Sequence, residues 1–171
     1  MARAAVEEFA TDGVGEHLGC VVDAPFTTTH RFASDLAGYR GWYWACVLAL
    51  GDYMRKCGFK KALLGLSGGI DSAIVAAMAV DALGPENVRC VMLPSEFTSA
   101  ESLELATAAA KALGCRYDTV PISGAQAAVG EALAPLFAGT EAGITEENIQ
   151  SRLRGLMLMA LSNKFGEMLL T

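Results

Sequence analysis

The feature that most constrains the fold of this chain is a repeated order of short apolar runs and longer amphipathic segments. Apolar runs at 62–66, 88–93 and 117–122 each precede a segment with the periodicity of a helix. Runs of this length are typical of buried strands, and strands that alternate with helices form parallel sheets. The sequence therefore predicts an α/β fold built on a doubly wound parallel sheet.

Capping and breaking residues set the expected limits of the helices. Glycine and proline end helices, whereas serine, threonine and acidic side chains favour their first turns. Thr98 and Glu101 form a capping-box pattern at the start of one helix. Helices are expected from Ser34 to Gly58, from the glycine-rich loop to about Leu83, from Thr98 to Gly114, from about Ser123 to Phe137, and from Thr145 to Leu170.

Length and composition suit one compact domain. The chain has 171 residues, of which 53% are hydrophobic, enough to build a core. Residues 1–33 mix glycine, threonine, aspartate and histidine without a sustained period, and we expect a linker or arm there, before a domain of residues 34–171. The five cysteines are widely spaced without a C-x-x-C pair, which favours reduced thiols over a zinc site.

Charge and hydropathy argue against two classes of partner. A formal net charge of −6 leaves no excess of basic side chains to neutralise a nucleic-acid backbone or to hold an anionic membrane. No apolar run reaches the roughly 18 residues that span a bilayer, and the N-terminus lacks the apolar core of a secretory signal. We therefore expect a cytoplasmic protein with no nucleic-acid partner and no membrane partner.

The segment 65–72, with the sequence GLSGGIDS, carries the clearest chemical signal. It lies between a predicted strand and the start of a predicted helix, where unpaired backbone N–H groups favour an anion. Gly68 and Gly69 are expected to reach positive φ and to let a phosphate approach the backbone. The two serines of the segment add hydroxyl donors. Asp71 fits beside an anion if a divalent cation bridges the two, so the segment predicts a phosphate-binding loop.

Three other types of loop are alternative interpretations of this segment. It lacks the Lys-Ser/Thr ending of a Walker loop, and its glycines miss the G-x-G-x-x-G spacing of dinucleotide sites. Residues 65–69 do match the G-x-S-x-G turn of α/β-hydrolases. In those enzymes several strands precede the turn and the catalytic histidine follows it, whereas His17 and His30 both lie upstream here. A hydrolase would require a histidine beyond Thr171.

The S-G-G-x-D-S pattern of residues 67–72 resembles the pyrophosphate-binding loop of the N-type ATP pyrophosphatases, a family that includes NAD synthetase, GMP synthetase and asparagine synthetase. This resemblance implies a Rossmann-like sheet of the adenine nucleotide alpha hydrolase type. In the family a further segment follows the last helix and supplies more ATP contacts. We therefore expect a chain that ends at Thr171 to be incomplete at its C-terminal end and inactive by itself.

Within that family, residues 34–171 most resemble the C-terminal synthetase domain of NAD synthetase, of the glutamine-dependent type. Residues 92–95 with Thr98 and Ser99 are similar to the family's segment that lies against the adenosine. Residues 147–154, with the sequence ENIQSRLR, are similar to the start of a helix that contacts deamido-NAD. This last segment separates NAD synthetase from the other members.

The resemblance also implies roles for individual residues. Ser67 and Asp71 would be the catalytic residues, and Asp71 would also bind Mg²⁺. The deamido-NAD contacts would be Asn148, Gln150 and Arg152. The ATP contacts would be Gly65, Leu66, Ser67, Gly68, Gly69, Ile70, Asp71, Ser72, Leu93 and Ser95.

The spacing within the last predicted helix agrees with this assignment. Asn148 and Arg152 are one helical turn apart and share a face, and a guanidinium suits a phosphate or carboxylate of a dinucleotide. A solvated first turn, in which Arg152 and Arg154 offset the acidic residues before them, is the alternative. The buried stripe on the opposite side is expected to consist of Ile149, Leu153, Leu156 and Ala160.

The reaction that the resemblance implies is the ATP-dependent amidation of deamido-NAD to NAD. The nicotinate carboxylate attacks the α-phosphate of ATP, pyrophosphate leaves, and ammonia opens the acyl-adenylate with release of AMP. ATP and Mg²⁺ are the expected cofactors, and the ammonia would be free or come from glutamine through a glutaminase domain. A homo-oligomer is expected. The alternatives are a GMP synthetase-like amidotransferase, an inactive nucleotide-binding fragment and, less favoured, an α/β-hydrolase.

Overall fold

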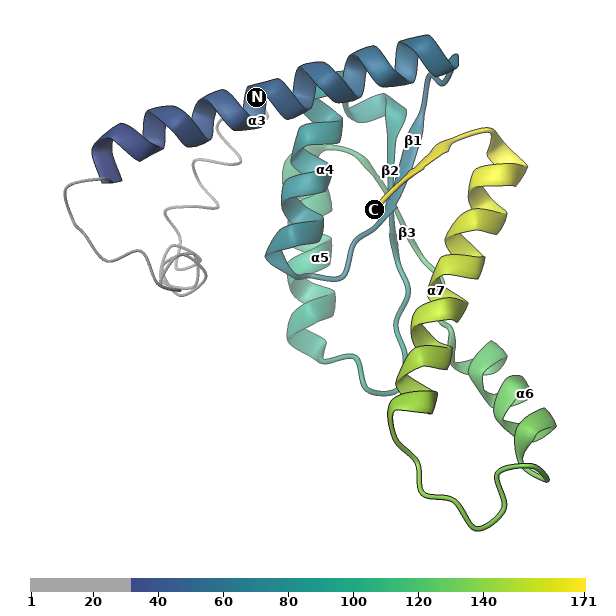
Figure 1. Cartoon of the computed structure of the whole chain (residues 1–171). Helices are drawn as coiled ribbons and strands as arrows, with labels where there is room; N and C mark the ends of the chain where they lie inside the picture. Colours follow the sequence, from purple (N-terminus) through teal and green to yellow (C-terminus); the bar gives the residue numbers. More distant parts are fainter. Residues whose placement is uncertain (1–31) are drawn as a thin grey trace.

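The computed structural model describes residues 32–171, and its side chains from residue 41 onward (Figure 1). The predicted arm of residues 1–33 therefore lies outside the described residues, apart from the first two residues of helix α3. The helices are α3 (Phe32–Cys57), α4 (Ile70–Leu83), α5 (Ala100–Leu113), α6 (Ser123–Leu133) and α7 (Ile144–Phe165), with a 3₁₀ turn η1 (Pro85–Asn87). The strands are β1 (Ala62–Gly65), β2 (Val88–Met92), β3 (Arg116–Thr119) and β4 (Met168–Leu170).

The four strands form one parallel sheet in the order β3-β2-β1-β4. Helices α4 and α5 cover one face, and α7 covers the other, with α6 beside its N-terminal half (Figure 1). The chain winds from β1 to β3 in one direction and then returns across the sheet to place β4 on the other side of β1. The doubly wound α/β prediction is confirmed, and the direction of winding changes between β1 and β4.

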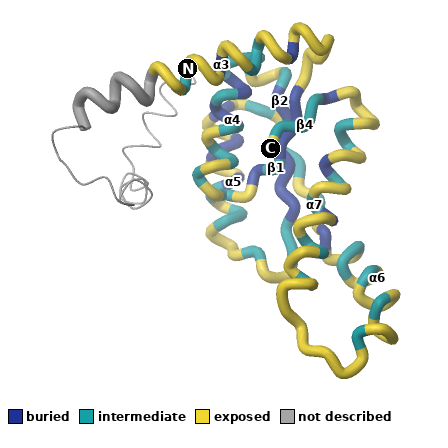
Figure 2. Tube along the Cα trace, viewed as in Figure 1, coloured by how far each residue is buried: buried dark blue, intermediate teal, exposed yellow. Residues whose placement is uncertain are grey.

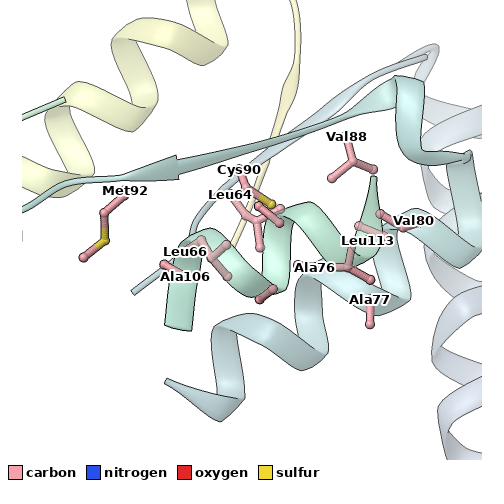
Figure 3. Close-up of a cluster of buried hydrophobic side chains, with 13 residues drawn as sticks. Leu64, Leu66, Ala76, Ala77, Val80, Val88, Cys90, Met92, Ala106 and Leu113 are labelled. Atoms are coloured by element: carbon pink, nitrogen blue, oxygen red, sulfur yellow. The ribbon is translucent and has the colours of Figure 1, made fainter. Parts of the chain in front are cut away.

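The larger core lies between the sheet and the pair α4 and α5 (Figure 3). Alternate residues of β2, such as Val88, Cys90 and Met92, point to this face, as the pleat of a strand requires. Small alanines of the two helices, among them Ala76 and Ala106, let the helices approach the sheet closely. The two central strands are thus covered on both faces (Figure 2).

A smaller core lies between the sheet and α7. Leu63, Val91 and Leu93 point to this face and pack with Leu158 of α7. A Cβ on Gly65 would lie 3.2 Å from the Leu158 side chain, so the glycine gives α7 room to pack on β1. Glycine at this strand end therefore serves helix packing.

Helix α3 packs on α4 along one side only. Val47 and Met54 are buried on that side, and the Tyr43 hydroxyl donates a 2.7 Å hydrogen bond to the carboxylate of Asp81. Burial and the neighbouring carboxylate raise the pKa of Tyr43 well above its usual range. No described helix is long and apolar enough to cross a membrane.

Three expected helix starts need correction. Helix α3 begins at Phe32, two residues before the predicted Ser34. Ser99, and not Thr98, caps α5, because its hydroxyl accepts the backbone N–H of Ser102. The Thr98 hydroxyl instead accepts the N–H of Ser95 and closes the turn before the helix. Helix α7 begins after Gly143, one residue earlier than Thr145, and the Glu146 carboxylate accepts the N–H of Gly143. That hydrogen bond lowers the pKa of Glu146.

The expected helix ends also need correction. The helix predicted to reach Phe137 ends at Leu133, and turns follow it. The helix predicted to reach Leu170 ends at Phe165, because Gly166 adopts a left-handed conformation with φ +65°. The residues after Gly166 then pair with β1 as strand β4.

The expected buried stripe of α7 is wrong in half of its members. Leu153 is buried and Ile149 is partly buried, whereas Leu156 is 65% exposed and Ala160 is exposed as well. The sheet instead contacts Leu158 and neighbouring apolar residues. Helix α7 carries apolar side chains on several sides, so periodicity does not define its buried side.

A buried ion pair joins the C-terminal end of α7 to the sheet. Arg89 of β2 and Glu167, only 6% and 5% exposed, lie 3.0 Å apart from Nε to Oε2, at an angle outside hydrogen-bond geometry. The Arg89 guanidinium also lies 4.3 Å from the ring centroid of Phe165. A buried charge that loses its partner is costly, so this pair should be important for stability.

We therefore expect Glu167→Gln to lower the free energy of unfolding by up to about 3 to 5 kcal/mol, because it leaves the buried Arg89 with only a 3.8 Å contact to the Asp118 carboxylate. Urea unfolding followed by circular dichroism measures this. The matched control is Asp52→Asn, which breaks an exposed 2.7 Å pair with Arg55 and should cost less than about 1 kcal/mol. Equal effects of the two substitutions would show that the buried pair is not a stabilising contact.

Candidate nucleotide-binding site

The predicted phosphate loop connects β1 to α4 at the carboxyl end of the sheet. Leu66 still belongs to the sheet, because its N–H donates to Val91 O at 2.9 Å. The chain then leaves β1 at Ser67, beside the point where the winding direction changes. Ligands of open α/β sheets bind at such a point, beyond the carboxyl ends of the strands.

Two serine hydroxyls close this loop. The Ser67 and Ser72 hydroxyls lie 3.1 Å apart, and Ser72 donates to Gly69 O at 2.9 Å. The N–H of Ser67 donates to the Ser72 hydroxyl, and the N–H of Gly69 donates to the Ser67 hydroxyl, both at 3.2 Å. These bonds hold the loop in a defined shape, with Ser67 exposed and Ser72 partly exposed.

Gly68 brings a second helix to the loop. Its φ is +84°, and a Cβ there would overlap the carbonyl oxygen of Ser102 and lie 2.9 Å from the Ser102 Cα. Only glycine fits so close to the first turn of α5. Because Gly69 is the residue before α4, the N-termini of α4 and α5 converge on the same loop.

This convergence creates a surface suited to an anion. The backbone N–H groups of Gly68, Ile70 and Asp71 have no acceptor within residues 32–171. Each helix also carries a partial positive charge at its N-terminus. Unpaired N–H groups and two helix ends together favour a phosphate or another anion.

The positive-φ prediction is correct for Gly68 and wrong for Gly69, which has φ −83°. The reason is that Gly69 precedes the helix in an extended conformation, which any residue can adopt. A Cβ on Gly69 would lie 3.4 Å from the Ser67 hydroxyl, an ordinary contact. The fold therefore does not require glycine at position 69, where a side chain would lie beside the Ser67 hydroxyl.

Asp71 lies in the first turn of α4 with its carboxylate exposed. No group of three His, Cys, Asp or Glu side chains in the described residues could hold a metal ion. Mg²⁺ usually keeps several waters and takes only one or two carboxylates together with substrate phosphates. A lone carboxylate beside an anion-binding loop therefore fits Mg²⁺ that arrives with a nucleotide.

Three of the predicted ATP contacts cannot use their side chains. Leu66 and Leu93 are buried in the two cores, and Gly65 faces Leu158. Any contact of these residues with ATP would have to be made by the backbone. Ser95 lies in the turn after β2, where its hydroxyl is 3.4 Å from the N–H of Phe97.

The predicted dinucleotide contacts lie on the N-terminal half of α7, which extends past the carboxyl ends of the strands (Figure 1). The Arg152 guanidinium donates to the side chain of Asn148 at 3.0 Å and to its carbonyl at 3.2 Å. Both residues are exposed, and Gln150 is partly buried. The predicted shared face of Asn148 and Arg152 is thus confirmed.

Arg154 is a residue whose role the sequence did not indicate. Its guanidinium turns inward, where Nε donates to Leu93 O at 3.1 Å and Nη2 lies 3.4 Å from the Ser95 hydroxyl. The alternative prediction was that both arginines of this segment are solvated and offset their acidic neighbours. It is wrong for Arg154. The contact with Leu93 spans 61 residues of sequence, so no local pattern could have revealed it.

The loop differs from the nucleophile turn of hydrolases. In that turn the serine occupies a strained backbone conformation. All residues with positive φ in the described chain are glycines, and the Ser67 hydroxyl is hydrogen-bonded within the loop. Neither of the chain's histidines, His17 and His30, lies within the described residues.

Known proteins share the sequence of most of this chain. The model of the NAD synthase family matches residues 43–171. A glutamine-dependent NAD(+) synthetase from Rhodobacter capsulatus is 64% identical over 129 residues, which cover 75% of this chain and 23% of that protein. A second, from Synechocystis, is 54% identical over 127 residues, which cover 74% of this chain and 23% of the relative.

Solved structures share the fold. The glutamine-dependent NAD+ synthetase from Acinetobacter baumannii, in complex with ADP, is 44% identical with a TM-score of 0.73, over 74% of this chain and 24% of that chain. This chain thus spans about a quarter of the length of the curated relatives it matches. Since the family model covers most of its residues, the chain belongs to the NAD synthase family.

Proposed function

We propose that this chain provides the ATP-binding part of a ligase that amidates deamido-NAD to NAD at the expense of ATP. The observation that carries the proposal is the loop of residues 66–72, where two helix N-termini and unpaired backbone N–H groups meet. A relative with the same fold is described in complex with ADP, which supports a nucleotide at this family's site.

The proposed reaction needs a carboxylate oxygen to become a leaving group, which transfer of the adenylyl group from ATP achieves. The nicotinate carboxylate attacks the α-phosphate, and the bond between the α- and β-phosphates breaks. Ammonia then displaces AMP from the acyl-adenylate, leaving the amide. In this scheme the N–H groups of Gly68 and Ile70 and the hydroxyls of Ser67 and Ser72 stabilise the departing pyrophosphate. No side chain forms a covalent bond with the substrate.

Asp71 would bind Mg²⁺ carried in by the nucleotide, and its exposed carboxylate beside the loop supports this role. The ion would neutralise charge on the pyrophosphate. Ser67 would act by donating a hydrogen bond, which requires its hydroxyl to exchange its contact with Ser72 for one with phosphate.

Asn148, Gln150 and Arg152 would contact deamido-NAD from α7. Asn148 and Arg152 are exposed and already hydrogen-bonded to each other, which presents a positive charge and an amide on one face. The relatives named above are glutamine-dependent, so we propose that ammonia derives from glutamine.

We further propose a cytoplasmic location and self-association. Cys90 and Cys115 remain free thiols with sulfur atoms 3.5 Å apart, as a reducing compartment would allow. Helix α3 exposes Trp42, Trp44 and Leu48, side chains that a second copy could cover.

Titration calorimetry tests the proposed function. The chain should bind ATP with Mg²⁺ present, and deamido-NAD should bind as well. A purine mononucleotide should not displace deamido-NAD, whereas displacement would favour a GMP synthetase-like activity. If ATP does not bind, the proposed function is wrong for this chain.

Gly69→Val should weaken ATP binding by about tenfold or more and leave the fold intact, because the new side chain would lie in ordinary contact with the Ser67 hydroxyl and block the approach of a phosphate to it. Calorimetry gives the affinity, and urea unfolding gives the stability. Gly130→Val in α6 is the matched control, because a Cβ there meets nothing within 4 Å. Unchanged ATP affinity in Gly69→Val would contradict the loop assignment.

Asp71→Asn should reduce the gain in ATP affinity that Mg²⁺ provides, by on the order of tenfold, because it removes a charged ligand of the ion. The affinity is measured with and without Mg²⁺. Glu101→Gln, which removes the acidic side chain from the first turn of α5, is the control for a general change of charge at a helix start. If both variants respond to Mg²⁺ like the unmodified chain, Asp71 is not a metal ligand.

A further inference from the structure

The departure of the chain from β1 leaves the carbonyl group of Leu93, the residue after β2, without a strand partner. Met92 O and Pro94 O accept from Val120 and Ile122 on the β3 side, and Val91 O accepts from Leu66 on the β1 side. By this alternation Leu93 O also points to the β1 side. There the chain has already turned away, and no backbone N–H in the described residues donates to Leu93 O.

Arg154 of α7 fills this gap. Its Nε donates to Leu93 O at 3.1 Å, in a partly buried position. A buried carbonyl needs a donor, and a charged donor forms a stronger bond than a neutral one. The guanidinium thus replaces the N–H that a longer β1 would have provided.

The same guanidinium reaches the turn that follows. Arg154 Nη2 lies 3.4 Å from the Ser95 hydroxyl. Within that turn, the N–H of Ser95 donates to Thr98 Oγ1 at 2.9 Å, and the N–H of Thr98 donates to Ser95 O at 3.1 Å. The turn is therefore internally ordered, and Arg154 attaches it to α7.

Arg154 lies on α7 between a residue that packs on the sheet and a residue that points to the exposed side. Leu158, one helical turn after Arg154, packs against Gly65 at the end of β1. Arg152, two residues before Arg154, points to the exposed side and contacts Asn148. Arg154 therefore links the helix that carries the proposed deamido-NAD contacts to the turn that contains the proposed ATP contact Ser95.

We propose that Arg154 is a positioning residue, which holds the turn of residues 93–98 in the conformation that receives the nucleotide and couples it to α7. This inference rests on the proposed function for its link to ATP. The ordering of the turn by Arg154 does not rest on that function. It depends only on the contacts of Arg154 with Leu93 O and with the Ser95 hydroxyl.

Hydrogen exchange followed by mass spectrometry tests the structural part on the whole chain without ligand. In Arg154→Ala, amides of residues 95–98 should exchange roughly tenfold faster or more, because the turn loses its attachment. Exchange in β1 and α4 should not change. Arg152→Ala, which removes an arginine from the exposed side of the same helix, should leave the turn unaffected.

Calorimetry with ATP and Mg²⁺ then tests the link to the nucleotide. Arg154→Ala should weaken ATP binding by roughly tenfold, while Arg152→Ala should leave ATP binding unchanged and weaken binding of deamido-NAD. Arg154→Lys keeps a charged donor for Leu93 O and should restore part of the affinity. It also serves as the second variant if Arg154→Ala does not fold.

The outcomes separate the two proposals. If the unmodified chain does not bind ATP, the proposed function fails, while exchange in the turn still decides whether Arg154 orders it. If the unmodified chain binds ATP but neither Arg154 variant changes exchange in the turn or ATP affinity, the positioning role is overturned and the proposed function stands. If Arg154→Ala instead speeds amide exchange equally throughout the sheet, Arg154 has a general structural role, and the positioning role is again overturned.

Discussion

The site depends on one close backbone contact, between Gly68 and the first turn of α5. With φ +84° and no room for a Cβ beside Ser102, this position accepts only glycine. The contact lets the chain turn from β1 into α4 while the N-terminus of α5 lies alongside. Two helix ends and several unpaired N–H groups therefore face the same volume, which is the physical basis of a phosphate-binding surface.

The same turn has a cost for the sheet, because β1 ends before β2 and leaves Leu93 O without a strand partner. Arg154 supplies the missing donor from α7. At the opposite end of that helix, Glu167 forms a buried ion pair with Arg89 of β2. Helix α7 is apolar on several sides, so packing alone would not fix its rotation. The two charged contacts, together with Leu158 on Gly65, decide which side meets the sheet.

Much of the architecture was predictable because it is local. The apolar runs and the breaking residues located every strand and helix up to β3, and the S-G-G-x-D-S pattern located the loop. Errors arose where several residues could perform the same task. Thr98 and Ser99 could both cap α5, and the backbone direction selected Ser99. Leu156 and Leu158 could both face the sheet, and Leu158 is the one that lies opposite Gly65.

The sequence by itself determined the fold class, the family and the position of the phosphate loop, because periodicity, breakers and a short motif are all encoded by neighbouring residues. Only the tertiary structure decided which glycine of the loop is obligatory, since this depends on α5, more than 30 residues away. It also assigned Arg154 to the sheet and Arg152 to the exposed side. Two arginines separated by one residue point to different sides of a helix, and only the packing of α7 determines which one is turned inward.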